Sequence, residues 1–179
     1  MNQVVQISKK NGVSIGAHPS FNDPENFGRQ RMNLSSDEIK KLIIDQYEIL
    51  QKIADSYGEK VTHIKPHGAL NNMACEDIEL ATTLAKAINE ISKDLIYLVP
   101  TGSKMEVAAN KLNMKIACEI FADRNYEDDG NVCIHGDNES SLATARSIRE
   151  NLLENGLKLK PLNQMNKFIW LLKKLFLHF

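Results

Sequence analysis

Hydrophobic and polar residues follow two different periods along the chain, and these predict short strands separated by amphipathic helices. Five β-prone runs are predicted as strands, at residues 13–17, 61–65, 95–99, 114–119 and 131–134. Apolar residues at helical spacing predict helices between them, at residues 3–10, 35–58 and 78–91, from residue 103 onward, and up to residue 156. Strands that alternate with helices in this way are typical of an α/β fold with parallel strands.

Short motifs predict where several helices begin and end. Ser35 and Glu38 have the spacing of a capping box, and Ser103 and Glu106 repeat that spacing. Gly12 follows a helical run and is interpreted as its C-terminal stop. Ser103 is interpreted as a helix cap and not as a nucleophile, because no Gly-x-Ser-x-Gly elbow surrounds it.

Length, composition and charge narrow the class of protein. The 179 residues are 42% hydrophobic and 25% charged, which fits one globular domain with a sizeable core. The net charge of -1 gives no electrostatic footprint for nucleic acid. Cys75, Cys118 and Cys133 lie far apart, which favours buried thiols in a reducing cytoplasm over a disulfide framework. The sequence shows no signal peptide and no run long enough to span a membrane, so a cytoplasmic location is expected.

Side chains suited to catalysis recur where the predicted strands end. Pro66 cannot donate to a sheet ladder, so the strand before it should stop near Lys65 and place His67 just beyond the sheet. The candidate site residues all follow β-prone runs; they are His18, Lys65, His67, Asp123, Arg124, His135 and Asp137. Parallel strands with right-handed crossovers bring such positions to one end of a sheet or barrel, so we expect these side chains to converge.

Each of these residues also has a purely structural interpretation when it is taken alone. His67 would then cap a turn and Lys65 would be solvated. Glu119 and Asp123 would pair with Arg124 as a structural ion pair. The loop at residues 20–31, with two phenylalanines and Arg29, is either functional or a surface loop with its aromatic rings tucked inward.

Several longer motifs resemble the LamB/YcsF family, the lactam-utilisation group that includes the A subunit of the ATP-dependent 5-oxoprolinase. The motifs lie at residues 16–21, 26–29, 65–70, 119–126 and 135–137, in the order of the family. The resemblance implies an incomplete (β/α) barrel of the glycoside hydrolase/deacetylase type, with about five parallel strands and helices outside. It also implies an enzyme that works with 5-oxoprolinase subunits B and C and opens 5-oxo-L-proline to L-glutamate, with ATP as co-substrate.

The sequence departs from the family pattern at three places. The two strands with which family members begin are not found, and Met1 falls inside the helix that would follow them. A second gap is expected between Gly130 and Asn131, and Asn71 stands where the family usually has Tyr. We therefore expect a partial barrel domain at residues 1–162 and an amphipathic tail at residues 163–179. The tail would dock on the incomplete barrel, bind a membrane surface or be frameshifted sequence without function.

The chemistry implied by the resemblance suits these side chains, although their individual roles stay open. Lys65 and Arg124 are suited to a phosphate or to the substrate carboxylate. His18, His67 and His135 are candidate general acids or bases. Asp123 or Asp137 would orient an imidazole ring. No Walker-type loop is present, so a nucleotide would be held without one. Two alternatives remain: a metal-dependent, deacetylase-like hydrolase that uses His18, His67 and an acid, or a catalytically inactive remnant.

Overall fold

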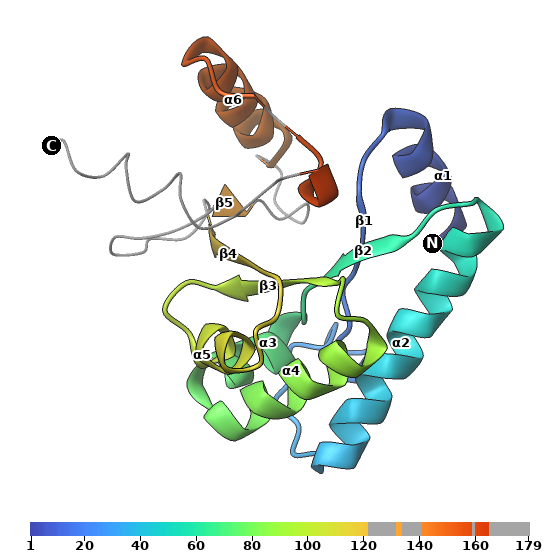
Figure 1. Cartoon of the computed structure of the whole chain (residues 1–179), viewed down its shortest axis with the longest axis vertical. Coiled ribbons are helices and arrows are strands. Elements are labelled where there is room, and N and C mark those ends of the chain that lie inside the picture. The colour runs from blue at the N-terminus through green and yellow to red at the C-terminus, as the bar shows by residue number, and fades with distance from the viewer. Residues whose placement is uncertain (122–131, 134–140, 159, 165–179) are drawn as a thin grey trace, which may run out of the picture.

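A computed structural model of the chain shows an α/β fold built on five parallel strands (Figure 1). The structure describes residues 1–121, 132–133, 141–158 and 160–164. The strands pair in the order in which they follow along the chain; they are β1 (Ile15–Ala17), β2 (Val61–Ile64), β3 (Ile96–Pro100), β4 (Ile116–Phe121) and β5 (Val132–Cys133). All four pairings are parallel, so the expected α/β class is confirmed. The described strands form an open sheet with β1 at one edge, as expected for an incomplete barrel.

Helices alternate with the strands and form most of the core. The α-helices are α1 (Asn2–Asn11), α2 (Ser36–Ser56), α3 (Gly68–Glu76), α4 (Ile78–Ile91), α5 (Lys104–Lys111) and α6 (Ser141–Glu154), followed by the short 3-10 helix η1 (Leu162–Gln164). Helices α2, α3, α4 and α5 gather on one side of the sheet, with α4 packed against the other three (Figure 1). Tyr97, Val99 and Ile64 are fully buried beneath this layer, which explains the apolar runs in the sequence.

The capping motifs confirm the predicted ends of the helices, with one difference. Ser35 and Glu38 make both halves of the capping box at the start of α2, and Gly12 ends α1 with a left-handed φ of 63°. Ser103 caps α5 by accepting from the Glu106 amide. The Glu106 carboxylate, however, accepts from the Gly102 amide, 2.8 Å away, because the Ser103 amide already donates to a main-chain carbonyl. The second capping box is therefore displaced by one residue.

Strands β1 and β4 begin two residues later than predicted because the preceding helices use the first residues of the predicted runs. The Val13 amide donates to Ser8 O at 2.9 Å and so closes α1 before β1 begins. The Met114 amide donates to Ala109 O at 3.1 Å and closes α5 in the same way. A β-prone residue directly after a helix therefore satisfies the end of that helix first, and the sheet ladder begins a few residues later.

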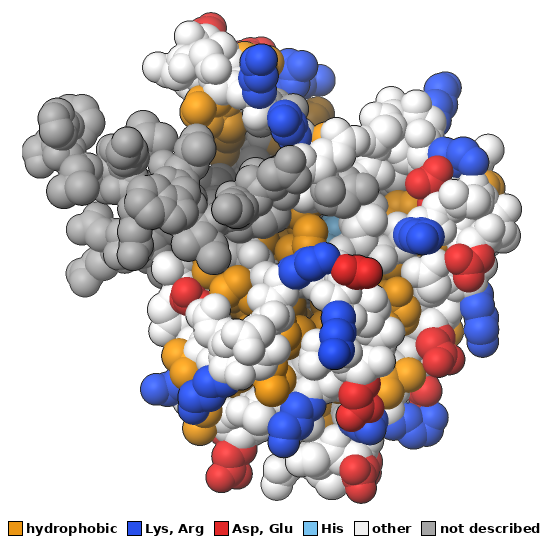
Figure 2. All heavy atoms as spheres, viewed as in Figure 1, with side chains coloured by type: hydrophobic (Ala, Val, Ile, Leu, Met, Phe, Trp, Pro, Cys, Tyr) orange, Lys and Arg blue, Asp and Glu red, His pale blue; other side chains and the backbone are white. Residues whose placement is uncertain are grey.

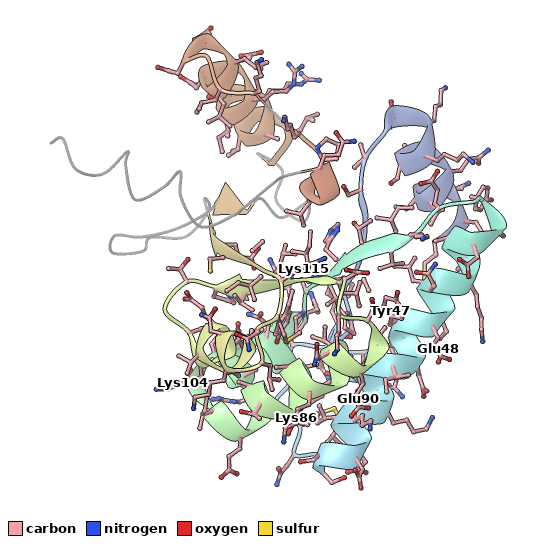
Figure 3. All side chains as sticks on the ribbon, in the orientation of Figure 1. Tyr47, Glu48, Lys86, Glu90, Lys104 and Lys115 are labelled. Atoms are coloured by element: carbon pink, nitrogen blue, oxygen red, sulfur yellow. The ribbon has the colours of Figure 1, made fainter. Side chains whose placement is uncertain are left out.

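Charged side chains cover the outer surfaces of the helices. Figure 2 shows lysines, arginines and acidic residues interspersed on one face of the molecule, in keeping with the net charge of -1. Figure 3 labels several of them, among them Glu90, which pairs with Lys40 and so joins α4 to α2, and Lys115, which pairs with Asp94. Such exposed pairs stabilise a protein only slightly, so the apolar core dominates the energetics. None of the described helices is both long enough and apolar enough to cross a membrane.

Candidate functional site

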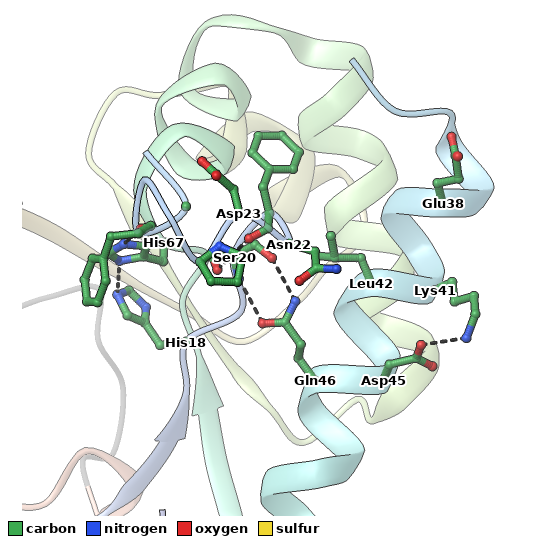
Figure 4. Close-up of a pocket in the computed structure, with 14 residues that line it drawn as sticks. His18, Ser20, Asn22, Asp23, Glu38, Lys41, Leu42, Asp45, Gln46 and His67 are labelled. Carbon is green, nitrogen blue, oxygen red and sulfur yellow. Dashed lines mark hydrogen bonds and ion pairs between the residues drawn. The ribbon is translucent and has the colours of Figure 1, made fainter. Parts of the chain in front are cut away.

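Two histidines from neighbouring strand ends are in direct contact. His18 directly follows β1, and His67 is the residue before α3. His67 Nδ1 lies 3.0 Å from His18 Nε2, and the ring centroids are 4.7 Å apart with an angle of 76° between the planes (Figure 4). The predicted convergence of strand ends therefore holds for these two residues.

The outer nitrogen of each ring is bound to a main-chain carbonyl. His18 Nδ1 lies 2.7 Å from Lys65 O, and His67 Nε2 lies 2.9 Å from Phe27 O. A carbonyl oxygen only accepts hydrogen bonds, so both of these nitrogens carry a hydrogen. Both ring orientations are thus fixed by the backbone.

Main-chain hydrogen bonds continue the pairing of β1 and β2 beyond the ends of the strands. The Lys65 amide donates to Ala17 O at 3.0 Å, and the His67 amide donates to Pro19 O at 2.8 Å. Pro66, between the two donors, has no amide hydrogen and interrupts the ladder for only one residue. The two histidines are therefore placed by backbone geometry and not by flexible loops.

Lys65 forms a buried ion pair with an acid two strands away. Its Nζ lies 2.7 Å from Glu119 Oε1, and the two side chains are only 13% and 8% exposed. The solvated interpretation of Lys65 is thus wrong. The described partner of Glu119 is Lys65; Arg124 lies outside the described residues, so the expected ion pair with Arg124 stays a prediction. Glu119 was not among the predicted site residues. An acid within an otherwise apolar strand is the signal that would have identified it.

The loop at residues 20–31 combines both interpretations left open by the sequence. Phe21 is tucked into the core and is 2% exposed, whereas Phe27 is 67% exposed. The Phe27 ring stands edge-on to the His67 ring, with centroids 5.3 Å apart, and the Arg29 guanidinium lies 5.6 Å from the Phe27 centroid. Phe27 has a left-handed φ of 56°, which is uncommon for a bulky residue. The loop therefore has a packed half and a half that faces the histidines.

A cavity of about 600 Å³ opens beside the two histidines (Figure 4). Its walls are the loop at residues 20–28, the N-terminal half of α2, and His18 with His67. Gln46 of α2 holds the loop in place, because its side-chain amide bonds both the amide and the carbonyl of Ser20, at 3.1 Å and 2.8 Å. Asp23 also lines the cavity, and its Oδ2 is buried without a hydrogen-bond partner among the described residues.

His63 lies close to the site, on β2, and was also missed. Thr62 Oγ1 donates to Ile15 O, so it accepts from His63 Nδ1, 3.0 Å away, which fixes the tautomer of this ring. A Cβ atom at Gly16 would collide with the His63 ring, so only glycine fits beside it. Burial lowers the pKa of His63 below its ordinary value.

The remaining predicted residues lie outside the described part of the chain. They are Asp123, Arg124, His135 and Asp137, and their approach to the histidines stays a prediction. The same holds for residues 165–179 of the predicted tail. Among the described residues, no group of three His, Cys, Asp or Glu side chains is placed to hold a metal ion.

Comparison with known proteins shows the family. The model of the LamB/YcsF family matches residues 1–132 and 129–167. The chain belongs to the LamB/YcsF family. The match divides next to the gap expected between Gly130 and Asn131. His18, Lys65 and His67, the described members of the candidate site, all fall within the first segment.

Relatives of this LamB/YcsF chain are named for one enzyme. A protein from Nitrobacter hamburgensis, named as the A subunit of 5-oxoprolinase, is 35% identical over 206 residues, covering 90% of this chain and 81% of the relative. A protein of the same name from Natranaerobius thermophilus is 34% identical, with 90% and 80% covered. The crystal structure of the lactam utilization protein from Thermus thermophilus superposes with a TM-score of 0.82 and 27% sequence identity, covering 89% of this chain and 81% of that one. The fold and the family resemblance inferred from the sequence are thus confirmed.

Proposed function

We propose that this chain acts as the A subunit of an ATP-dependent 5-oxoprolinase and takes part in opening 5-oxo-L-proline to L-glutamate. The observation that carries the proposal is the contact of His18 with His67 at the ends of β1 and β2, beside the buried pair of Lys65 and Glu119. The relatives, which are named as the A subunit of 5-oxoprolinase, support the same assignment.

The chemistry of the substrate explains why such a site is suitable. A lactam carbonyl is stabilised by resonance, so ring opening near neutral pH needs activation of the carbonyl oxygen and a base-activated water. Phosphorylation of that oxygen by ATP would provide the activation. The leaving ring nitrogen needs a proton, which an imidazole at this position would supply. Lys65, with Arg124 as a predicted partner, would interact with the substrate carboxylate or the phosphoryl group.

The name of the relatives implies further subunits, and we propose that the chain works with 5-oxoprolinase subunits B and C.

A metal-dependent hydrolase is the competing proposal. It would need imidazole lone pairs directed at the metal, whereas the outer nitrogens of His18 and His67 face carbonyls and their inner nitrogens face each other. Metal analysis of the purified full chain, before any ATP or Mg²⁺ is added, separates the two proposals. A tightly bound metal ion in about equimolar amount would favour the metal-dependent reaction.

The direct test measures glutamate release from 5-oxo-L-proline by the full chain with subunits B and C, at varied ATP. The His67→Ala variant should lose about 10²–10⁴-fold in rate while its thermal unfolding stays close to that of the wild type. The exposed Lys86→Ala on α4 is the control and should retain full activity. Wild-type protein that releases no glutamate under these conditions, with all subunits folded, would refute the proposal and favour an inactive remnant.

A further inference from the structure

The contact between His18 and His67 implies a specific number of protons. The two outer ring nitrogens carry hydrogens, because each faces a carbonyl oxygen that only accepts. If both rings were neutral, each inner nitrogen would then have a lone pair and no hydrogen. Two lone pairs would face each other across 3.0 Å, with no proton between them.

We propose that His18 and His67 share one additional proton between their inner nitrogens, so that the pair carries a single positive charge and acts as one general acid. Three protons on four nitrogens satisfy all three contacts at once. The bridging bond then has an ionised donor, which makes it stronger than a bond between neutral groups.

The charges around the cavity favour a cation at this position. Among the described residues that line the cavity, three are carboxylates, Asp23, Glu38 and Asp45, and one is an ammonium, Lys41. Lys41 is paired with Asp45, at 2.6 Å, so it does not offset the other two acids. Asp23 lines the cavity, and its Oδ2 is buried without a hydrogen-bond partner among the described residues, so its charge adds to the negative potential that favours a cationic pair.

The loop that supplies the second carbonyl is built to hold its position. The Gly28 amide donates to Asp23 O at 2.9 Å, and the Ala69 amide at the start of α3 donates to Gly28 O at 3.0 Å. Phe27 and Gly28 both have left-handed φ angles, 56° and 67°. A Cβ at Gly28 would lie 2.8 Å from Ser20 Cβ, so the close approach requires glycine. The Phe27 carbonyl is therefore fixed toward His67, and with it the tautomer.

The role of the pair in catalysis rests on the proposed function. ATP phosphorylates the lactam oxygen and leaves as ADP, and the ring nitrogen loses its hydrogen. Water then adds to the lactam carbon, and the bond between that carbon and the ring nitrogen breaks. The nitrogen keeps the electron pair and takes the bridging proton of the two histidines together with one proton of the attacking water, so it leaves as an amine. The second proton of that water returns to the pair, and another water hydrolyses the remaining acyl phosphate to carboxylate and phosphate. The two outer hydrogens stay on their ring nitrogens, bonded to the carbonyls, throughout. The two rings thus act together and not as separate acids.

The proton count is tested without reference to activity. In the full chain with ¹⁵N-labelled histidine rings, at pH 7, the ¹H–¹⁵N spectrum should show three protons on the four nitrogens of His18 and His67, with one strongly downfield bridging proton. His63 serves as the internal reference, with a hydrogen on Nδ1. In His18→Ala, the His67 ring should become neutral with its hydrogen on Nε2. Two protons in total on the wild-type pair would overturn the proposal.

A double-mutant cycle tests the joint action. His18→Ala and His67→Ala should each lose about 10²–10⁴-fold in glutamate release, and the double variant should lose no more than the stronger single variant. Losses that multiply would show that the rings act independently and would overturn the proposal. Thermal unfolding of each variant checks that it is folded. Wild-type protein with the three-proton signature but no ring opening would refute the proposed function and leave the shared proton in place.

Discussion

Lys65 Nζ lies 2.7 Å from Glu119 Oε1, although Lys65 follows β2, Glu119 belongs to β4, and β3 lies between these two strands. The ion pair therefore crosses the middle of the sheet. Because both side chains are largely buried, the Glu119 charge depends on Lys65 for compensation among the described residues. This pair joins the end of β2, which bears His67, to the strand that leads toward the predicted residues Asp123 and Arg124.

Removal of Lys65 alone should strongly destabilise the protein. Lys65→Met leaves the Glu119 charge buried and should lower the free energy of unfolding by about 3–5 kcal/mol, whereas adding Glu119→Leu should recover much of the loss. Urea denaturation measures the free energy of unfolding of the single and the double variant. The control is Lys115→Met, which breaks an ion pair of the same length, 2.7 Å, between exposed side chains, and should cost less than about 1 kcal/mol (Lys115 is labelled in Figure 3). Equal losses for Lys65→Met and Lys115→Met would contradict this account.

Gly68, at the start of α3, should tolerate no side chain. Its φ is 58°, and a Cβ there would lie 2.5 Å from Gly28 O. Gly102 has a similar φ of 74° but nothing within 4 Å of a Cβ. Gly102→Ala should therefore cost only the conformational penalty, about 1–2 kcal/mol. Gly68→Ala should cost about 1–3 kcal/mol more and displace the loop that contacts His67. Chemical denaturation compares the two variants, and matching values would show that the loop moves aside freely.

The capping box of α2 should contribute measurably to stability. Ser35→Ala removes the oxygen that accepts from the Glu38 amide and should cost about 1 kcal/mol, within a range of about 0.5–2 kcal/mol. Ser36→Ala changes the next serine, which is also exposed, leaves the cap intact and removes only a 3.4 Å contact with Thr83 Oγ1, so it should cost less than Ser35→Ala. The difference between the two midpoints of urea unfolding is the relevant measurement. If Ser36→Ala were the more harmful change, the assignment of the cap would be wrong.

The lowered pKa of His63 predicts a loss of stability in acid. Because burial disfavours the charged ring, the unfolded chain binds a proton more readily, at its ordinary pKa of about 6.5. Stability should be unaffected above that pH and should fall as the pH drops from about 6.5 toward the lower folded pKa, by up to about 1.4 kcal/mol per pH unit. Thermal unfolding from pH 8 to pH 5 should show a smaller loss for His63→Asn, which keeps a donor for Thr62. Parallel curves for the two proteins would argue against a buried, neutral His63.

Most of the fold could be predicted from the sequence because it depends on local patterns. The apolar spacing in α2 and α4 and the cap at Ser35 specify helices without reference to the rest of the chain. The placement of His18 and His67 just beyond the ends of strands could be predicted from the β-prone runs and, for His67, from Pro66. The pairing of Lys65 with Glu119 could not be predicted, since the two residues are 54 positions apart and only the strand order brings them together. The hydrogen bond between the Phe27 carbonyl and His67 depends on the left-handed φ of Phe27. No sequence pattern around Phe27 predicts that angle.

The hydrogen bonds from the Lys65 and His67 amides to Ala17 and Pro19 have a consequence for motion. Because they extend the β1–β2 ladder, the strand ends that hold His18 and His67 cannot loosen while the sheet stays intact. Both amides should exchange their hydrogens with solvent only as fast as the neighbouring amides within β2. Substrate would then enter from the open side of the cavity, and the two histidines with the loop around Phe27 would form its rigid wall.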